Sequence, residues 1–152
     1  MKFYNTLDEY KDKDITIYVD MDGVIAEYDI GNFNYNTIRP LKSNIKRVEE
    51  LIKKDNIKVK ILTVCKTDKI VEEKIDWLKR NMSFFDINDV IFISKEQEEY
   101  KKVESQELKS NYLKEHMNST INILVDDDNS IIKYVRKNNK DLIVFQVSSW
   151  ID

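Results

Sequence analysis

The sequence predicts an α/β fold in which helices flank a parallel β-sheet. Short apolar runs alternate along the chain with longer stretches of helical periodicity, as expected of right-handed βαβ units. The chain has only two glycines and one proline, which favours long helices and short loops. With 152 residues, it is long enough to bury its own core, so we predict a single domain over residues 1–152.

Five stretches have the composition of buried strands. Each is a short run of mainly apolar residues, many of them β-branched or aromatic, although lysines interrupt the second at first. Apolar runs of this kind are typical of strands that helices cover on both faces. The predicted strands are residues 15–19, 57–64, 90–93, 121–125 and 142–147.

The stretches between these strands carry apolar residues at helical spacing. We expect Ser43 to cap the first helix, which runs to about residue 55. Thr67 and Asp68 are expected to begin the second helix, which runs to about residue 80.

A third predicted helix begins at about residue 106, and a fourth at Asn129 or Ser130. Residues 1–14 are expected to be a polar lead-in, with at most a short helix near residues 7–10. Residues 27–40 and 95–105 are expected to be loops, the first of them lying over the strand ends.

Composition excludes several classes of function. The net charge is −3 and the charges are mixed along the chain, so no basic field favours a nucleic-acid partner. Cys65 is the single cysteine, which rules out an internal disulfide and fits a reducing compartment. No apolar run approaches the length of a membrane span, and no signal peptide begins the chain. We therefore expect a soluble, cytoplasmic protein without a membrane partner.

Acidic residues follow the first predicted strand directly. Asp20 and Asp22 lie two positions apart, and side chains along an extended chain repeat with period two, so both carboxylates are expected on one side. Gly23 then allows a sharp turn. Such a pair offers one carboxylate as nucleophile and the other as proton donor and acceptor, with a metal ion between them.

The fourth predicted strand also ends in acids, at Asp126 and Asp127. In parallel sheets the ligand crevice lies at the carboxyl ends of the strands. The sequence therefore predicts a site at that edge of the sheet.

Residues 19–26, Val-Asp-Met-Asp-Gly-Val-Ile-Ala, resemble the first motif of the haloacid dehalogenase-like phosphatases, and within them short bacterial and phage proteins of the 5'(3')-deoxyribonucleotidase type. Thr63 resembles the second motif and Asp126-Asp127 the fourth, in the family's order. Residues 73–78 resemble a further family stretch. The resemblance implies a Rossmann-like core with minimal or no cap, because the segment between Asp22 and Thr63 is too short for a helical cap.

The resemblance also implies a role for each residue. Asp20 would attack phosphorus and form an aspartyl-phosphate, and Asp22 would act first as general acid and then as base. The hydroxyl of Thr63 would bind a phosphate oxygen. Lys109 is the predicted lysine of the third motif, with Lys95 as the alternative.

The implied cofactor is Mg²⁺, which prefers one or two carboxylates together with water and substrate phosphate. Its predicted ligands are Asp20, the backbone carbonyl of Asp22, and one of Asp126 and Asp127.

The predicted function is a Mg²⁺-dependent phosphomonoesterase for small phosphorylated metabolites, with deoxyribonucleoside and ribonucleoside monophosphates first among them. Tyr28, Phe33 and Tyr35 in the first loop are expected either to pack or to cover a nucleobase. One alternative is a capless phosphatase acting on phosphoprotein or polynucleotide ends. Another is a non-enzymatic phosphoacceptor domain. The base, the sugar, the phosphate position and the oligomeric state stay open.

Overall fold

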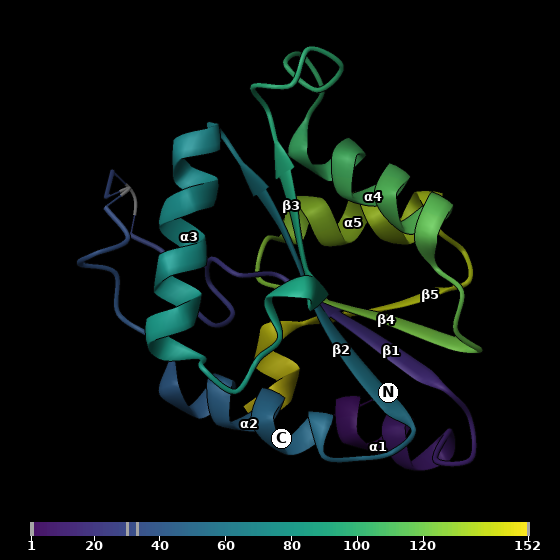
Figure 1. Ribbon diagram of the computed structural model, residues 1–152. Helices are drawn as coiled ribbons and strands as arrows, with labels where there is room; N and C mark the ends of the chain where they lie inside the picture. The colour runs from purple at the N-terminus through teal and green to yellow at the C-terminus, as the bar shows by residue number, and fades with distance from the viewer. Residues whose placement is uncertain (1, 30, 33, 152) are drawn as a thin grey trace.

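Five parallel strands form one sheet in the order β3-β2-β1-β4-β5 (Figure 1). The computed structural model describes residues 2–29, 31–32 and 34–151. The strands are β1 (Ile15–Val19), β2 (Ile57–Cys65), β3 (Val90–Ser94), β4 (Ile121–Asp126) and β5 (Leu142–Gln146). The predicted α/β fold with a parallel sheet is confirmed, and β1 lies at its centre.

Helices cover both faces of the sheet (Figure 1). They are α1 (Phe3–Glu9), α2 (Lys42–Ile52), α3 (Asp68–Asn81), α4 (Ser105–His116) and α5 (Asn129–Asn138), with short 3-10 helices η1 (Ile87–Asp89) and η2 (Val147–Ile151). Connections that step from β1 outward to β2 and β3 place α2 and α3 on one face. Connections on the other side of β1 place α4 and α5 on the opposite face.

The alternation of side chains along β1 divides the core in two. Ile15, Ile17 and Val19 belong to the cluster that includes residues of α1, α2 and α3. Tyr18 points the other way and belongs to the cluster that includes residues of α4 and α5. The same alternation decides which helix can reach each side chain at the strand ends.

The N-terminal segment is part of the core, so the prediction of a polar lead-in was wrong. Phe3 and Leu7 of α1 are buried, and the Phe3 ring lies 5.5 Å from Phe145 and 5.7 Å from Trp150, between ring centroids. Two apolar residues four positions apart are enough to seat a short helix on the sheet. The other residues of 1–14 are mostly polar, so the sequence did not predict that Phe3 and Leu7 are buried.

The predicted start of α2 was also wrong. The helix begins at Lys42 and ends at Ile52, and its N-cap is Leu41, which makes no capping hydrogen bond with its side chain. The Leu41 N–H donates to the Ile25 carbonyl at 2.8 Å, so the returning chain sets the start of this helix rather than Ser43. At α3, by contrast, the predicted cap is confirmed, because the Thr67 hydroxyl accepts from the Ile70 N–H at 3.1 Å.

No helix or strand occurs among the described residues between β1 and α2. Two isolated bridges, Asp22 to Ala26 and Ala26 to Pro40, close this segment back on itself. The described part of the connection is thus a loop held at both ends, in agreement with the expected minimal cap. Phe33 lies outside the described residues.

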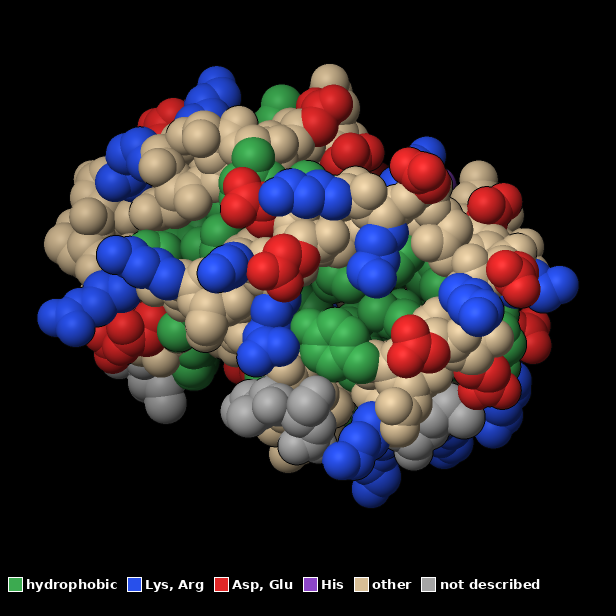
Figure 2. Space-filling model, turned by 90° about the horizontal axis from the view of Figure 1, so that it is seen from below, with side chains coloured by type: hydrophobic (Ala, Val, Ile, Leu, Met, Phe, Trp, Pro, Cys, Tyr) green, Lys and Arg blue, Asp and Glu red, His purple; other side chains and the backbone are tan. Residues whose placement is uncertain are grey.

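The surface seen from below in Figure 2 mixes acidic and basic side chains around a small group of hydrophobic ones. Lysines and arginines do not form a continuous basic patch on this face. Across the described ranges, the structure contains no helix with the length and apolarity needed to cross a membrane.

Candidate active site

The ends of β1 and β4 bring two carboxylates together. Val19 and Val125 are partners in the register, and the Asp20 N–H donates to the Val125 carbonyl at 3.0 Å. Asp20 therefore lies beside Asp126, the last residue of β4. By alternation Asp20 shares the face of Tyr18, which is the face that α4 and α5 cover.

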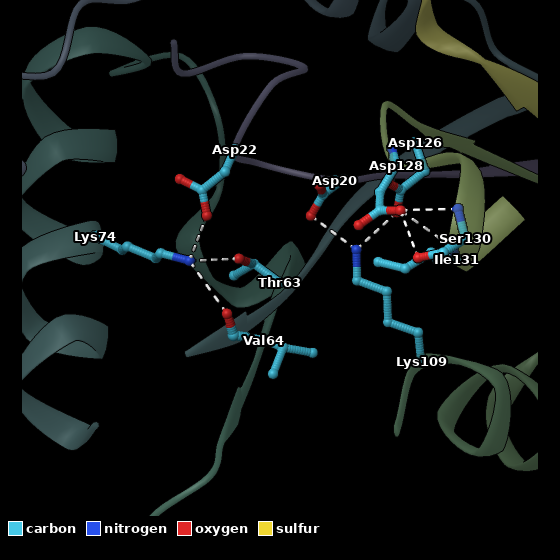
Figure 3. Close-up of polar contacts among 10 residues, drawn as sticks. All are labelled: Asp20, Asp22, Thr63, Val64, Lys74, Lys109, Asp126, Asp128, Ser130 and Ile131. Carbon is cyan, nitrogen blue, oxygen red and sulfur yellow. Dashed lines mark hydrogen bonds and ion pairs between the residues drawn. The ribbon is translucent and has the colours of Figure 1, made fainter. Parts of the chain in front are cut away.

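Lys109 of α4 joins these two carboxylates (Figure 3). Its Nζ lies 2.8 Å from Asp20 Oδ1 and 2.8 Å from Asp126 Oδ2, and its side chain is 2% exposed. Burial alone would lower the pKa of Lys109, but the two carboxylates outweigh burial and raise it. The lysine is therefore a permanent positive charge between the strand ends. Lys95, the alternative, does not line the pocket described below.

Three carboxylates lie close enough to hold a cation. Ligand oxygens of Asp20, Asp126 and Asp127 lie within 4.8 Å of one another. Burial and the neighbouring charge of Asp126 raise the pKa of Asp127 to about 6. Burial raises the pKa of Asp20 to about 8, although Lys109 opposes this. Lys109 balances only one negative charge, and an all-oxygen donor set suits a hard divalent cation, so these residues fit a metal ion.

We expect the affinity of this site for Mg²⁺ to rise with pH between about 6 and 8. Below these values Asp127 and Asp20 hold protons that a cation must displace, and above them that competition ends. The shift of the melting temperature on adding Mg²⁺, measured across this range, tests it. In Asp127→Asn the affinity should be lower and its pH dependence weaker. An affinity that is constant or falls with pH would contradict the expectation.

Gly23 makes room for the carboxylate of Asp127. Its φ is +81°, a conformation that favours glycine, and a Cβ at this position would overlap the Asp127 carboxylate. The glycine of the motif is thus required both by the turn after β1 and by the side chain that approaches it from beyond β4.

Gly23→Ala should therefore weaken Mg²⁺ binding and destabilise the fold by at least about 1–3 kcal/mol. Gly31→Ala is a matched control, because Gly31 has a φ of +88° but open space where its Cβ would lie. The control should lose stability through the backbone alone and keep its Mg²⁺ affinity. Mg²⁺ titrations and thermal melts of both variants make the comparison, and equal Mg²⁺ affinities would show that the overlap is harmless.

A second lysine, Lys74 of α3, holds the other half of the site (Figure 3). Its Nζ donates to Thr63 Oγ1 at 2.7 Å, to Asp22 Oδ2 at 3.0 Å and to the Val64 carbonyl at 3.4 Å, and its side chain is 1% exposed. Thr63 shares the face of Ile61, which α3 covers, so this lysine rather than Lys109 reaches it.

The sequence motifs assign Lys74 no role of its own, although its position in the helix carries a signal. Lys74 follows Ile70 by four residues and precedes Trp77 by three, so it lies inside the apolar stripe of α3. A lysine in the middle of a buried face requires a partner, and a carboxylate at a strand end is the natural one.

The remaining predicted residues fall into different places. Asp22 belongs to the Lys74 side, and its carboxylate is not one of the three in the acidic group. Thr63 lies within β2, which continues to Cys65, two residues past Thr63. Asp128, for which the sequence predicts no role in the site, is the N-cap of α5, and hydrogen bonds from Ser130 lower its pKa.

A pocket of about 420 Å³ joins the two halves of the site. Asp20, Asp22 and Lys109 line it together with Tyr28, the large hydrophobic side chain that is most exposed among the described residues at 61%. The other lining residues are Val64, Ser105, Asp127, Asp128 and Ile131. The pocket thus combines a carboxylate-rich floor with an exposed aromatic ring at its edge.

Comparison with known proteins identifies the fold but not the family. No protein-family model and no curated protein matches the sequence. Among solved structures, a chain from the "Structure of the Pnkp1/Rnl/Hen1 RNA repair complex" is similar, with a TM-score of 0.65 and 17% identity. The match covers 89% of this chain and 42% of the other, so the chain spans less than half of that protein's length. At this identity the similarity is one of fold.

Proposed function

We propose that the protein is a metal-dependent phosphomonoesterase that works through an aspartyl-phosphate on Asp20. The observation that carries the proposal is the contact of Lys109 with both Asp20 and Asp126. The positive charge of this buried lysine reduces the electrostatic repulsion between the Asp20 carboxylate and an incoming phosphate. We also propose that the chain belongs to the haloacid dehalogenase-like phosphatases, which its motifs resemble.

In the first step a carboxylate oxygen of Asp20 attacks phosphorus, and the bond from phosphorus to the ester oxygen breaks. Asp22, across the pocket, gives the departing alkoxide the proton that it recovers from water in the second step, and the alkoxide leaves as an alcohol. Lys109 keeps Asp20 oriented and balances the charge of Asp126. A divalent cation held by Asp20, Asp126 and Asp127 would neutralise the incoming phosphate.

In the second step Asp22 takes a proton from water, and the water oxygen attacks phosphorus of the aspartyl-phosphate. The bond to Asp20 breaks, phosphate leaves, and both carboxylates return to their starting state. The Thr63 hydroxyl accepts from the Lys74 ammonium, which leaves its own proton available for a phosphate oxygen during both steps.

Small phosphorylated metabolites are the proposed substrates, with deoxyribonucleoside and ribonucleoside monophosphates first among them, and Mg²⁺ is the proposed cation. Tyr28 is consistent with a nucleoside leaving group, because its exposed ring lies at the edge of the pocket, where a flat base can stack on it. A cytoplasmic location is proposed because Cys65 is the single cysteine in the sequence, so no internal disulfide calls for an oxidising compartment.

A phosphorylated polynucleotide end is the second candidate substrate. It is favoured by the loop between β1 and α2, which leaves the pocket without a separate covering domain in the described residues. The four aspartates that line the pocket, with Lys109 beside them, count against a long polyanion.

The test is phosphate release by the whole protein from nucleoside monophosphates, sugar phosphates, a 3'-phosphorylated oligonucleotide and an aryl phosphate, with Mg²⁺ and with chelator. The proposal expects Mg²⁺-dependent release, fastest from nucleoside monophosphates. Preference for the oligonucleotide would support the second candidate. Release from none of these substrates would overturn the proposed activity.

A further inference from the structure

The loop between β1 and α2 sends one side chain directly to the proposed acid–base residue. The Tyr35 hydroxyl donates to Asp22 Oδ1 at 2.7 Å, and Tyr35 is 5% exposed. Burial and the adjacent charge of Asp22 raise the pKa of Tyr35, so its hydroxyl remains a donor. An aromatic residue that could have covered a nucleobase is thus turned inward to a carboxylate.

Helix α3 holds this loop in place. Trp77 Nε1 donates to the Ile38 carbonyl at 3.0 Å, and Arg80 Nη2 donates to the Tyr35 carbonyl at 3.3 Å. Trp77 is fully buried and Arg80 follows it by three residues, about one helical turn, so the loop is held along the helix that carries Lys74. Tyr35 therefore has a fixed backbone from which its hydroxyl reaches Asp22.

Asp22 receives a different donor at each oxygen. Tyr35 occupies Oδ1 and Lys74 occupies Oδ2, and the Lys74 ammonium lies 5.5 Å from the centroid of the Tyr35 ring. The terminal torsion of an aspartate is broad, so one donor leaves the carboxylate plane free to turn. Two donors from opposite sides fix that plane. Asp22 lies past the end of β1 and directly before the turn at Gly23, and its backbone does not fix the terminal torsion of its side chain.

We propose that Tyr35 is a positioning residue that orients the Asp22 carboxylate toward the leaving group, acting together with Lys74. This inference rests on the proposed phosphatase function and extends it to the loop. A general acid works only within hydrogen-bonding distance of the oxygen that it protonates, and small errors of position are costly. The loop thereby contributes to proton transfer rather than to contact with the base.

The test compares two leaving groups in Tyr35→Phe, which removes one hydroxyl and keeps the packed ring. A nucleoside monophosphate releases a poor leaving group that needs a proton, whereas 2,4-dinitrophenyl phosphate releases one that does not. We expect kcat/KM, which reports the first step alone, to fall at least about tenfold for the first and less than about twofold for the second. Tyr10→Phe, at the end of α1, is the matched control and should change neither rate.

Equal losses on both substrates would reduce Tyr35 to a structural role and overturn the inference, as would no loss on either. Melting temperatures of the variants verify that both fold. The two proposals fail in different ways. If the wild-type protein hydrolyses neither substrate, the phosphatase function falls and this inference with it, whereas a wild-type rate without the leaving-group difference removes the inference alone.

Discussion

Asp20→Asn should abolish turnover, lowering kcat by at least about a thousandfold with saturating Mg²⁺. The amide has the shape of the carboxylate but cannot attack phosphorus, and it is a poorer ligand for a cation. The fold should survive, because Lys109 keeps its contact with Asp126 at 2.8 Å. Phosphate release from an aryl phosphate measures the effect.

Asp86→Asn is the matched control for this change. Asp86 caps η1 through a hydrogen bond from the Asn88 N–H at 2.9 Å, at the end of β3 away from the site. Asparagine caps as well as aspartate does, so this variant should retain its activity. Substantial turnover by Asp20→Asn would show that another group is the nucleophile.

Lys109→Met should cause the largest loss of stability, about 3–5 kcal/mol, because it leaves Asp20 and Asp126 buried without their cation. The sign of the pH dependence follows from the carboxylates. Burial raises the pKa of Asp20, so the variant should be least stable at high pH, where this residue must ionise, and should recover as pH falls and it takes up a proton. Urea unfolding at several pH values measures both effects.

Lys101→Met provides the comparison. Lys101 pairs with Glu98 at 2.8 Å, but both side chains are largely exposed, so loss of the pair should leave stability nearly unchanged. If the two lysine variants lose equal free energy of unfolding, the buried contacts of Lys109 stabilise the fold no more than an exposed ion pair does. Addition of Mg²⁺ should stabilise Lys109→Met, since a cation at the remaining carboxylates replaces part of the missing charge.

The strands could be predicted from the sequence because each is a short apolar run, and such runs have few alternatives in a chain of this composition. The positions of Asp20 and Asp126 follow, because they come directly after or at the end of those runs. Lys109 was placed by its resemblance to a family position. The contact itself depends on the rotation of α4 about its axis, which its weak apolar pattern does not fix.

What sequence reasoning missed depends on tertiary contacts. Lys74 is one lysine among many, and only the packing of α3 against β2 shows that it is buried beside Thr63. The hydrogen bond of Tyr35 to Asp22 and the start of α2 were missed for the same reason, because both depend on where a loop without helical or strand periodicity returns to the sheet. Local pattern carries little information about such a loop.

The most direct test of this account is to look for the phosphoryl group on Asp20. In Asp22→Asn the activated ester 2,4-dinitrophenyl phosphate can still transfer its phosphoryl group, because its leaving group needs no proton, but no base remains to assist hydrolysis. With Mg²⁺, mass spectrometry of the acid-quenched protein should find one phosphoryl group on the peptide that contains Asp20. A protein that releases phosphate without modification of Asp20, or that is modified elsewhere, would contradict the account.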